Sequence, residues 1–108
     1  MDPRPIPLVE RSLTSSDGTA IYADATGVPT NTAIVFIHGL SCTALGWEKQ
    51  FADAALCASF HLVRYEMRGH GRSGKPLEEE GYTSTKIAED FRTVCEAFGL
   101  VKPFIAGW

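Results

Sequence analysis

The sequence predicts an α/β fold with a mostly parallel sheet and helices on both of its faces. Strand-like and helix-like segments alternate along the chain, the order expected when helical crossovers join parallel strands. The stretch Ala33–Ile37 is apolar at every residue, which is typical of a parallel strand covered on both faces. The stretch Thr83–Phe98 is the clearest helix, with Gly99 placed to end it in a left-handed conformation. Its apolar stripe at helical spacing consists of Ile87, Phe91, Val94 and Phe98.

The N-terminal part is predicted to form an antiparallel hairpin at one edge of the sheet. Residues 1–7 contain three prolines and are expected to form an extended leader, with the domain itself covering residues 8–108. Leu8–Thr14 and Thr19–Ala25 have β character. Between them, the pair Asp17-Gly18 supplies the positive φ that a tight hairpin turn requires.

One helix is predicted between the first two buried strands. Trp47, Phe51 and Ala55 recur at i, i+4 and i+8, which gives one apolar face. We therefore expect a continuous helix over Ala44–Ala58.

The second half of the chain supplies two more buried strands. The first covers Phe60–Glu66 and leads into the glycine-rich turn 67–76. The second starts with the stretch Lys102–Ala106. Between them, Leu77–Tyr82 contains three consecutive glutamates and is expected to be a solvated loop.

Composition excludes several classes of function. The 108-residue chain has a net charge of −3, and its basic residues are scattered among acids, so we expect no nucleic-acid partner. It lacks a signal peptide and any apolar run long enough to span a bilayer, so no membrane association is expected. Its three cysteines, an odd number, favour reduced thiols in a cytoplasmic protein.

Four short motifs, taken in order, resemble the first half of an α/β-hydrolase. They are Phe36-Ile37-His38-Gly39, Trp47, Arg68-Gly69-His70-Gly71-Arg72-Ser73 and Phe104-Ile105-Ala106-Gly107-Trp108. The resemblance covers about Leu8 to Trp108 and implies the N-terminal half of a cofactor-independent serine hydrolase. Its substrate would be a small ester or similar acyl compound. The same fold also hosts epoxide hydrolases, dehalogenases and cofactor-free haloperoxidases, which differ in the nucleophile.

The resemblance implies that the catalytic side chains lie outside this chain. In that family the nucleophile occupies a sharp turn written Gly-x-Ser-x-Gly, and an acid and a histidine follow later. Gly107 and Trp108 match the first two positions of this turn, so the nucleophile would come next. The serines Ser41 and Ser73 lie near histidines only in sequence, which is no sign of a hydrogen bond between them. We expect the chain alone to be inactive and its missing C-terminal half to be its partner.

One catalytic part is implied within the chain, a backbone N–H of the oxyanion hole. In similar hydrolases the residue after His-Gly provides this donor, which here is Leu40. His38, Gly39 and Ser41 would support the oxyanion loop, with His38 acting as a structural hydrogen-bonding group rather than a base. Trp47 is open to two interpretations: a wall of the substrate pocket, or packing of the first helix on the sheet.

The glycine-rich turn also has two interpretations. Gly69–Gly74 spells G-x-G-x-x-G, a phosphate-binding pattern, but Lys75-Pro76 and glutamates follow where a helix would have to begin. We therefore favour a structural turn. Glu66 stands where the family usually has aspartate, which leaves the bonding around it open. The resemblance assigns structural roles to four residues of the turn: Arg68, Gly69, Gly71 and Ser73.

Two other functions remain as alternatives. His38 and Cys42 have the i, i+4 spacing of a metal pair, but no further nearby ligands complete a site, so no metal is expected. The chain could also be a binding or regulatory fragment that pairs with another chain. An apolar sheet edge left open at the last strand would be the contact surface in that case.

Overall fold

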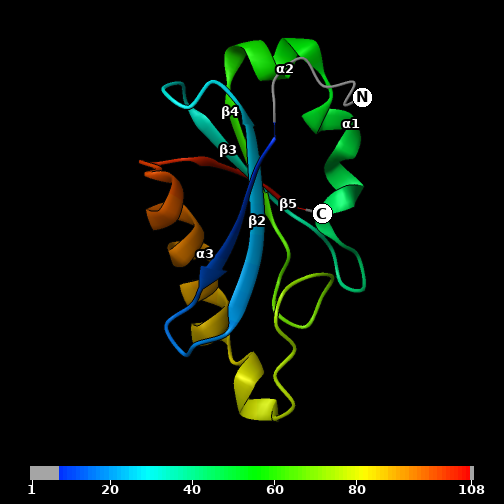
Figure 1. Ribbon diagram of the computed structural model, residues 1–108, viewed down its shortest axis with the longest axis vertical. Helices are drawn as coiled ribbons and strands as arrows, with labels where there is room; N and C mark the ends of the chain where they lie inside the picture. The colour runs from blue at the N-terminus through cyan, green and yellow to red at the C-terminus, as the bar shows by residue number, and fades with distance from the viewer. Residues whose placement is uncertain (1–7, 108) are drawn as a thin grey trace.

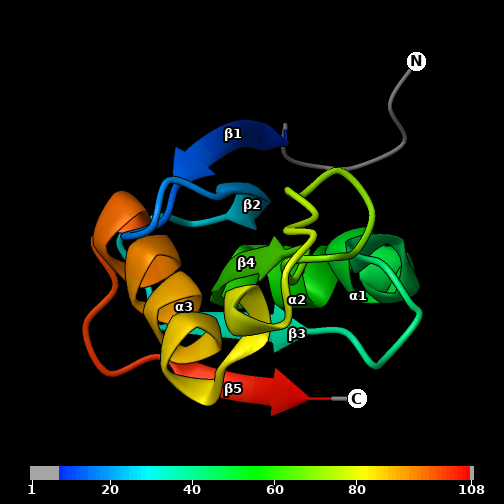
Figure 2. The same cartoon turned by 90° about the horizontal axis from the view of Figure 1, so that it is seen from below.

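The computed structural model describes residues 8–107. The predicted leader 1–7 and Trp108 lie outside the described residues. The five strands form one mixed sheet in the order β1-β2-β4-β3-β5, seen along its edge in Figure 2. The strands are β1 (Val9–Thr14), β2 (Ala20–Gly27), β3 (Ala33–Ile37), β4 (His61–Tyr65) and β5 (Phe104–Gly107).

The strand directions confirm the predicted α/β arrangement. β3 is parallel to both β4 and β5. β1 and β2 form the antiparallel hairpin, and β2 also pairs antiparallel with β4. The turn of the hairpin has Gly18 at a φ of 87°, as the Asp-Gly pair predicted.

Helices cover both faces of the sheet (Figures 1 and 2). The long helix α3 (Ser84–Phe98) covers one face, where its Val94 joins a core containing Val35 and Val63. On the other face, Phe51 and Cys57 join a core with Phe36 and Leu62. The elements on that face are the 3₁₀ helix η1 (Ala44–Trp47) and the helices α1 (Glu48–Phe51) and α2 (Ala54–Ser59). Neighbouring residues of β3 thus face opposite cores, as its continuous apolar run predicted.

The prediction of one helix over Ala44–Ala58 is wrong. The chain leaves the helical conformation at Asp53, whose side chain accepts a hydrogen bond from the Leu56 N–H and caps a new helix. The break changes which residues face the sheet. Cys57 is buried, whereas Ala55 of the predicted stripe is exposed.

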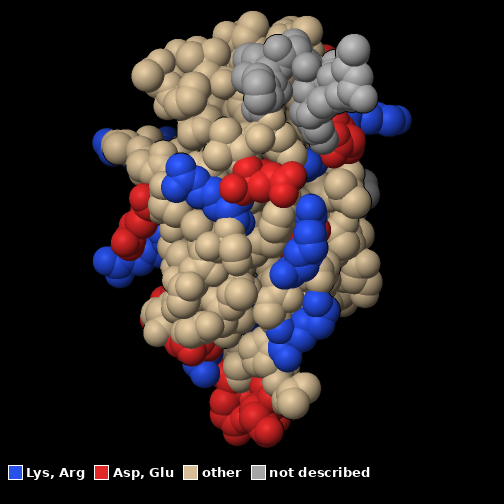
Figure 3. All heavy atoms as spheres, viewed as in Figure 1, with Lys and Arg blue, Asp and Glu red and all other residues tan. Residues whose placement is uncertain are grey.

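The later elements differ from the predictions mainly at their ends. α3 is capped by the Thr83 side chain, and Gly99 ends it with a φ of 65°, as predicted. The segment predicted as a loop contains a short 3₁₀ helix, η2 (Glu79–Tyr82). Figure 3 shows acidic side chains gathered at the end of the molecule where η2 lies, while basic and acidic side chains are both present over the rest of that face. Within residues 8–107, no helix has the length and apolar character needed to cross a bilayer.

Candidate functional site

Two loops meet at the carboxyl ends of the central strands. β3 and β4 are parallel neighbours with Ile37 opposite Tyr65, so the loops that follow them leave the same edge of the sheet. Gly107 of β5 lies opposite Ile37 on the other side. The structure therefore brings the predicted oxyanion loop, the glycine-rich turn and the start of the predicted nucleophile turn to one place.

His38 joins the two loops through both of its ring nitrogens. The Met67 N–H donates to His38 Nε2 at 3.0 Å. Because Nε2 accepts, the proton lies on Nδ1, which donates to the Gly39 carbonyl at 2.8 Å. With both nitrogens occupied by backbone groups, the buried His38 acts as a brace and not as a free base.

The residues after His38 form a tight turn. The Cys42 N–H donates to the Gly39 carbonyl at 3.1 Å, and Ser41 within the turn has a φ of 64°. A serine in this left-handed region is strained by roughly 1–2 kcal/mol. The Ser41 N–H donates to His70 Nε2 at 3.1 Å, which ties the turn to the neighbouring loop.

Leu40 occupies the second position of this turn. The residue is 87% exposed and is not among the residues that line the cavity beside this loop. Its backbone N–H has no hydrogen-bond partner within the described part of the chain. A backbone N–H that is not already bonded within the protein is one of the things an oxyanion donor requires.

A second histidine contact, absent from the sequence predictions, supports the same turn. His70 Nδ1 lies 3.1 Å from the Arg68 carbonyl, while its Nε2 accepts from Ser41. The rings of His38 and His70 lie 4.9 Å apart, centroid to centroid. The two loops are thus linked by two histidines, each bonded to the backbone at both nitrogens.

Arg68 fixes the glycine-rich turn to three distant segments. Its guanidinium makes a bidentate pair with Asp90 of α3, with both N···O distances 2.7 Å. It also donates to Asp17 of the hairpin turn and to the Gly81 carbonyl. The hydrogen bonds from Arg68 hold the pKa of Asp17 well below its usual value. No sequence pattern indicates that Asp90 is the partner, because an acidic residue in a helix fits a solvent-exposed position equally well.

Glu66, which stands where the family usually has aspartate, is hydrogen-bonded through its carboxylate to both neighbouring loops. Its carboxylate accepts from the Ala44 N–H at 3.1 Å and from the backbone and side chain of Arg72 at 2.8 and 2.9 Å. Burial opposes ionisation of Glu66, but these hydrogen bonds outweigh it and hold its pKa below the usual value. The longer side chain therefore caps η1 and closes the turn at the same time.

The remaining predicted turn residues lie close to these bonds. Ser73 Oγ donates to the Glu66 carbonyl and accepts from the Tyr22 N–H. Gly69 and Gly71 have φ values of 83° and 51°. A Cβ on Gly71 would lie 2.5 Å from the carboxyl carbon of Glu66. Glycine is required there because the backbone is left-handed and the carboxylate occupies the space.

A small cavity of about 180 Å³ opens beside the braced loop. Its lining includes His38, Cys42 and Trp47. The Trp47 ring also packs on Phe36, with centroids 5.0 Å apart. Trp47 therefore packs against the core and also lines this cavity, while its place in the wall of a substrate pocket stays a prediction.

No complete catalytic triad forms among residues 8–107. Ser41 contacts His70 through its backbone N–H rather than its hydroxyl, and the Ser73 hydroxyl donates to a backbone carbonyl. The same residues contain no cluster of three or more histidine, cysteine or acidic side chains able to hold a metal ion. The described residues thus provide a loop braced by His38 and His70, with a small cavity beside it.

The chain was compared with known proteins. Residues 32–108 match the family described as alpha/beta hydrolase fold. A solved structure from Burkholderia cenocepacia, of a protein provisionally named an aryl esterase, superposes with a TM-score of 0.87 at 37% identity, covering 93% of this chain and 37% of that one.

Two curated relatives carry other names. The non-heme chloroperoxidase of Streptomyces lividans is 32% identical over 82% of this chain and 31% of its own length. Epoxide hydrolase B of Mycobacterium tuberculosis is 28% identical over 83% of this chain and 26% of its own length. The chain thus spans about a third or less of the curated relatives it matches.

Proposed function

The chain belongs to the alpha/beta hydrolase fold family, and we propose that it supplies the oxyanion-binding part of a cofactor-independent, serine-type hydrolase. The substrate class we propose is a small ester or a similar acyl compound. The observation that carries this proposal is the N–H of Leu40, which has no partner among residues 8–107 and lies in the loop after β3, at the same sheet edge as Gly107.

The proposed mechanism is acyl transfer through a serine. A serine after Gly107-Trp108 would attack the carbonyl carbon, and the carbonyl oxygen would gain negative charge as the tetrahedral intermediate forms. The Leu40 N–H would donate to that oxygen, an interaction worth roughly 3 kcal/mol in such sites. The histidine that the family places later in the chain would take the serine proton and give it to the departing alcohol as the intermediate collapses to the acyl-enzyme. Water, losing a proton to the same histidine, would then release the acid and regenerate the serine.

The braced turn explains how a backbone donor can be preorganised. The N–H of Leu40 must keep its direction as charge develops, without reorganisation of the loop. The bonds of His38 to both loops and of Ser41 to His70 fix the residues on either side of Leu40. We propose that this bracing is the function of His38, Gly39 and Ser41 in the complete protein.

We propose that hydrolysis requires residues beyond those printed in this sequence. Among residues 8–107, the β5 strand pairs on one side with β3 and has no strand on its other side, and its Phe104 and Ile105 are 64% and 60% exposed. This apolar edge suits the next strand of the same fold, and that C-terminal part is the partner we propose. A binding fragment that pairs with a separate chain would use the same edge. We propose a cytoplasmic location, a compartment in which cysteines such as Cys42, Cys57 and Cys95 stay reduced.

An aspartate nucleophile is the main alternative. The match to an epoxide hydrolase supports it, because an aspartate in the same turn would open an epoxide through an ester intermediate. The match to a non-heme chloroperoxidase keeps cofactor-free haloperoxidase chemistry open as well. Dehalogenase chemistry would also use an aspartate and differs from epoxide opening in the leaving group.

One experiment separates these possibilities. The transcript is sequenced across the codon for Trp108, and the encoded protein is assayed with p-nitrophenyl acetate and with styrene oxide. After treatment with diisopropyl fluorophosphate, mass spectrometry locates any modified residue. The proposal is supported if the label lies on a serine directly after Trp108 and the labelled protein no longer hydrolyses the ester. An aspartate at that position with epoxide turnover refutes the serine mechanism, and a stop codon with an inert soluble product favours the binding fragment.

A further inference from the structure

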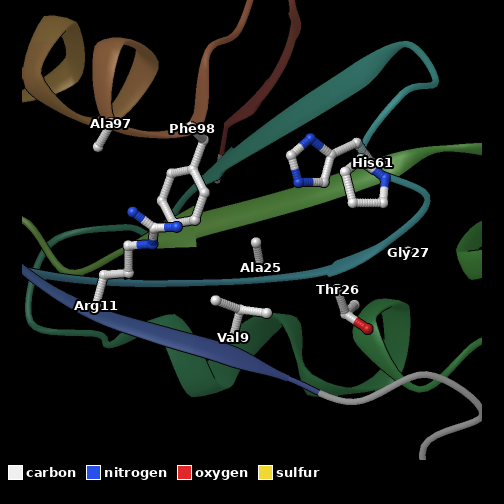
Figure 4. Close-up of a pocket in the computed structure, with 9 residues that line it drawn as sticks. Val9, Arg11, Ala25, Thr26, Gly27, His61, Ala97 and Phe98 are labelled. Carbon is white, nitrogen blue, oxygen red and sulfur yellow. The ribbon is translucent and has the colours of Figure 1, made fainter.

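A second cavity lies at the opposite end of the sheet from the braced loop. It has a volume of about 450 Å³ and lies between the β1–β2 hairpin and the end of α3 (Figure 4). His61, the first residue of β4, forms part of its wall, whereas the candidate site lies beyond Tyr65, the last residue of that strand. The two sites are therefore separated by the full length of β4.

The walls of this cavity are mainly apolar. Val9 and Ala25 contribute from the hairpin, and Ala97 and Phe98 contribute from the last turn of α3. A volume of this size falls within the range of about 300–1,000 Å³ that small-molecule sites occupy. The apolar walls favour a ligand with a hydrocarbon body.

His61 contributes its imidazole ring to the wall of the cavity. The residue is 5% exposed, and its Nδ1 is enclosed without a hydrogen-bond partner among the described residues. Burial lowers the pKa of the imidazole, so the ring is neutral near neutral pH. A buried acceptor without a partner costs less than a buried N–H without one, which favours the proton on Nε2. His61 would then present an N–H donor to the cavity.

Arg11 supplies a positive charge on the side of the Phe98 ring opposite His61. Its guanidinium carbon lies 5.2 Å from the centroid of that ring, and the His61 ring lies 6.3 Å from it. Figure 4 shows the Arg11 and His61 side chains on either side of Phe98. No carboxylate of residues 8–107 forms a salt bridge with Arg11. A cation without an acidic partner at the mouth of an apolar cavity favours an anionic ligand.

We propose that this cavity binds an elongated aliphatic carboxylate with a second oxygen. The carboxylate would accept from Arg11, the hydrocarbon chain would lie over Ala25 and Phe98, and the second oxygen would accept from His61 Nε2. The site is independent of the proposed hydrolase activity, because it shares no residue with the candidate functional site.

Three matched probes test the two polar contacts. Binding of 8-hydroxyoctanoate, octanoate and 1,8-octanediol to the purified protein is measured by calorimetry, with ¹⁵N-histidine spectra recording the His61 ring nitrogens. We expect saturable binding of 8-hydroxyoctanoate with a shift of the His61 Nε2 signal. Octanoate lacks the oxygen for His61 and octanediol lacks the carboxylate, so both should bind more weakly.

Two surface variants provide the controls. Arg11→Met keeps much of the apolar stem over Phe98 and should weaken 8-hydroxyoctanoate binding by about tenfold or more, the scale of a charge-assisted hydrogen bond. Arg92→Met removes an exposed arginine of α3 that pairs with Glu96 and should leave binding unchanged. Ala97→Trp should block the cavity. Equal binding of octanediol, equal effects of the two arginine variants, or no saturable binding up to the solubility limit would each overturn the proposal.

Discussion

Replacing Arg68 with methionine tests whether the glycine-rich turn is held by a buried ionic network. The Arg68 side chain is 1% exposed and bonds to Asp90, Asp17 and the Gly81 carbonyl. Without it, the hydrogen bond donated by Ser15 at 2.5 Å is the one that the buried Asp90 carboxylate keeps among residues 8–107. Removing one member of a buried pair leaves an uncompensated charge and costs about 3–5 kcal/mol. That is a large share of the roughly 5–15 kcal/mol that stabilises an ordinary domain.

The assay is urea unfolding followed by circular dichroism, with the free energies compared at a common m value. The double variant Arg68→Met, Asp90→Leu removes both charges and should recover at least half of the loss, because no buried charge remains at Asp90. Arg92→Met removes an arginine whose side chain is 80% exposed. This variant should lower the free energy of unfolding by less than about 1 kcal/mol. If Arg68→Met lowers the free energy of unfolding by no more than Arg92→Met does, the ionic network does not hold the turn.

Two further predictions concern the same turn and its hairpin contact. Gly71→Ala should destabilise by about 1–3 kcal/mol more than Gly18→Ala. Both positions have positive φ, but only the Cβ at Gly71 meets the Glu66 carboxylate, so equal losses in urea would refute the clash. Asp17 has a lowered pKa because Arg68 donates to it. Its stabilisation is therefore present above about pH 4 and is lost as the pH falls toward the folded-state pKa. The stability difference between wild type and Asp17→Asn should shrink from about pH 6 to about pH 2, and a constant difference would contradict the linkage.

The elements with strong local signals could be predicted from sequence. Ala33–Ile37 is apolar throughout and forms a strand between two cores. α3 combines a threonine cap, an apolar stripe and a terminal glycine, each of which depends only on nearby residues. The break at Asp53 was missed because a single acidic residue on a helical pattern gives no signal until its side chain is seen to cap the next helix.

The candidate site was only partly predictable. The order of the motifs predicts that the loop after His38 and the turn after Glu66 lie at the same edge of the sheet, because each follows a parallel strand. The bond between Ser41 and His70 and the pairing of Arg68 with Asp90 join segments 29 and 22 residues apart. Contacts at such separations depend on how the strands and α3 are packed, which local patterns do not specify.

The most direct test of the proposed function is a proline at position 40. In the complete protein, Leu40→Pro removes the backbone N–H, and proline suits the second position of a tight turn. Leu40→Ala keeps the N–H and is the matched control. The measurement is kcat/KM for p-nitrophenyl acetate, with circular dichroism confirming that both variants fold. We predict a loss of roughly 10²–10³-fold for the proline variant and little change for alanine. A proline variant that hydrolyses the ester as fast as the alanine variant would show that Leu40 is not the oxyanion donor.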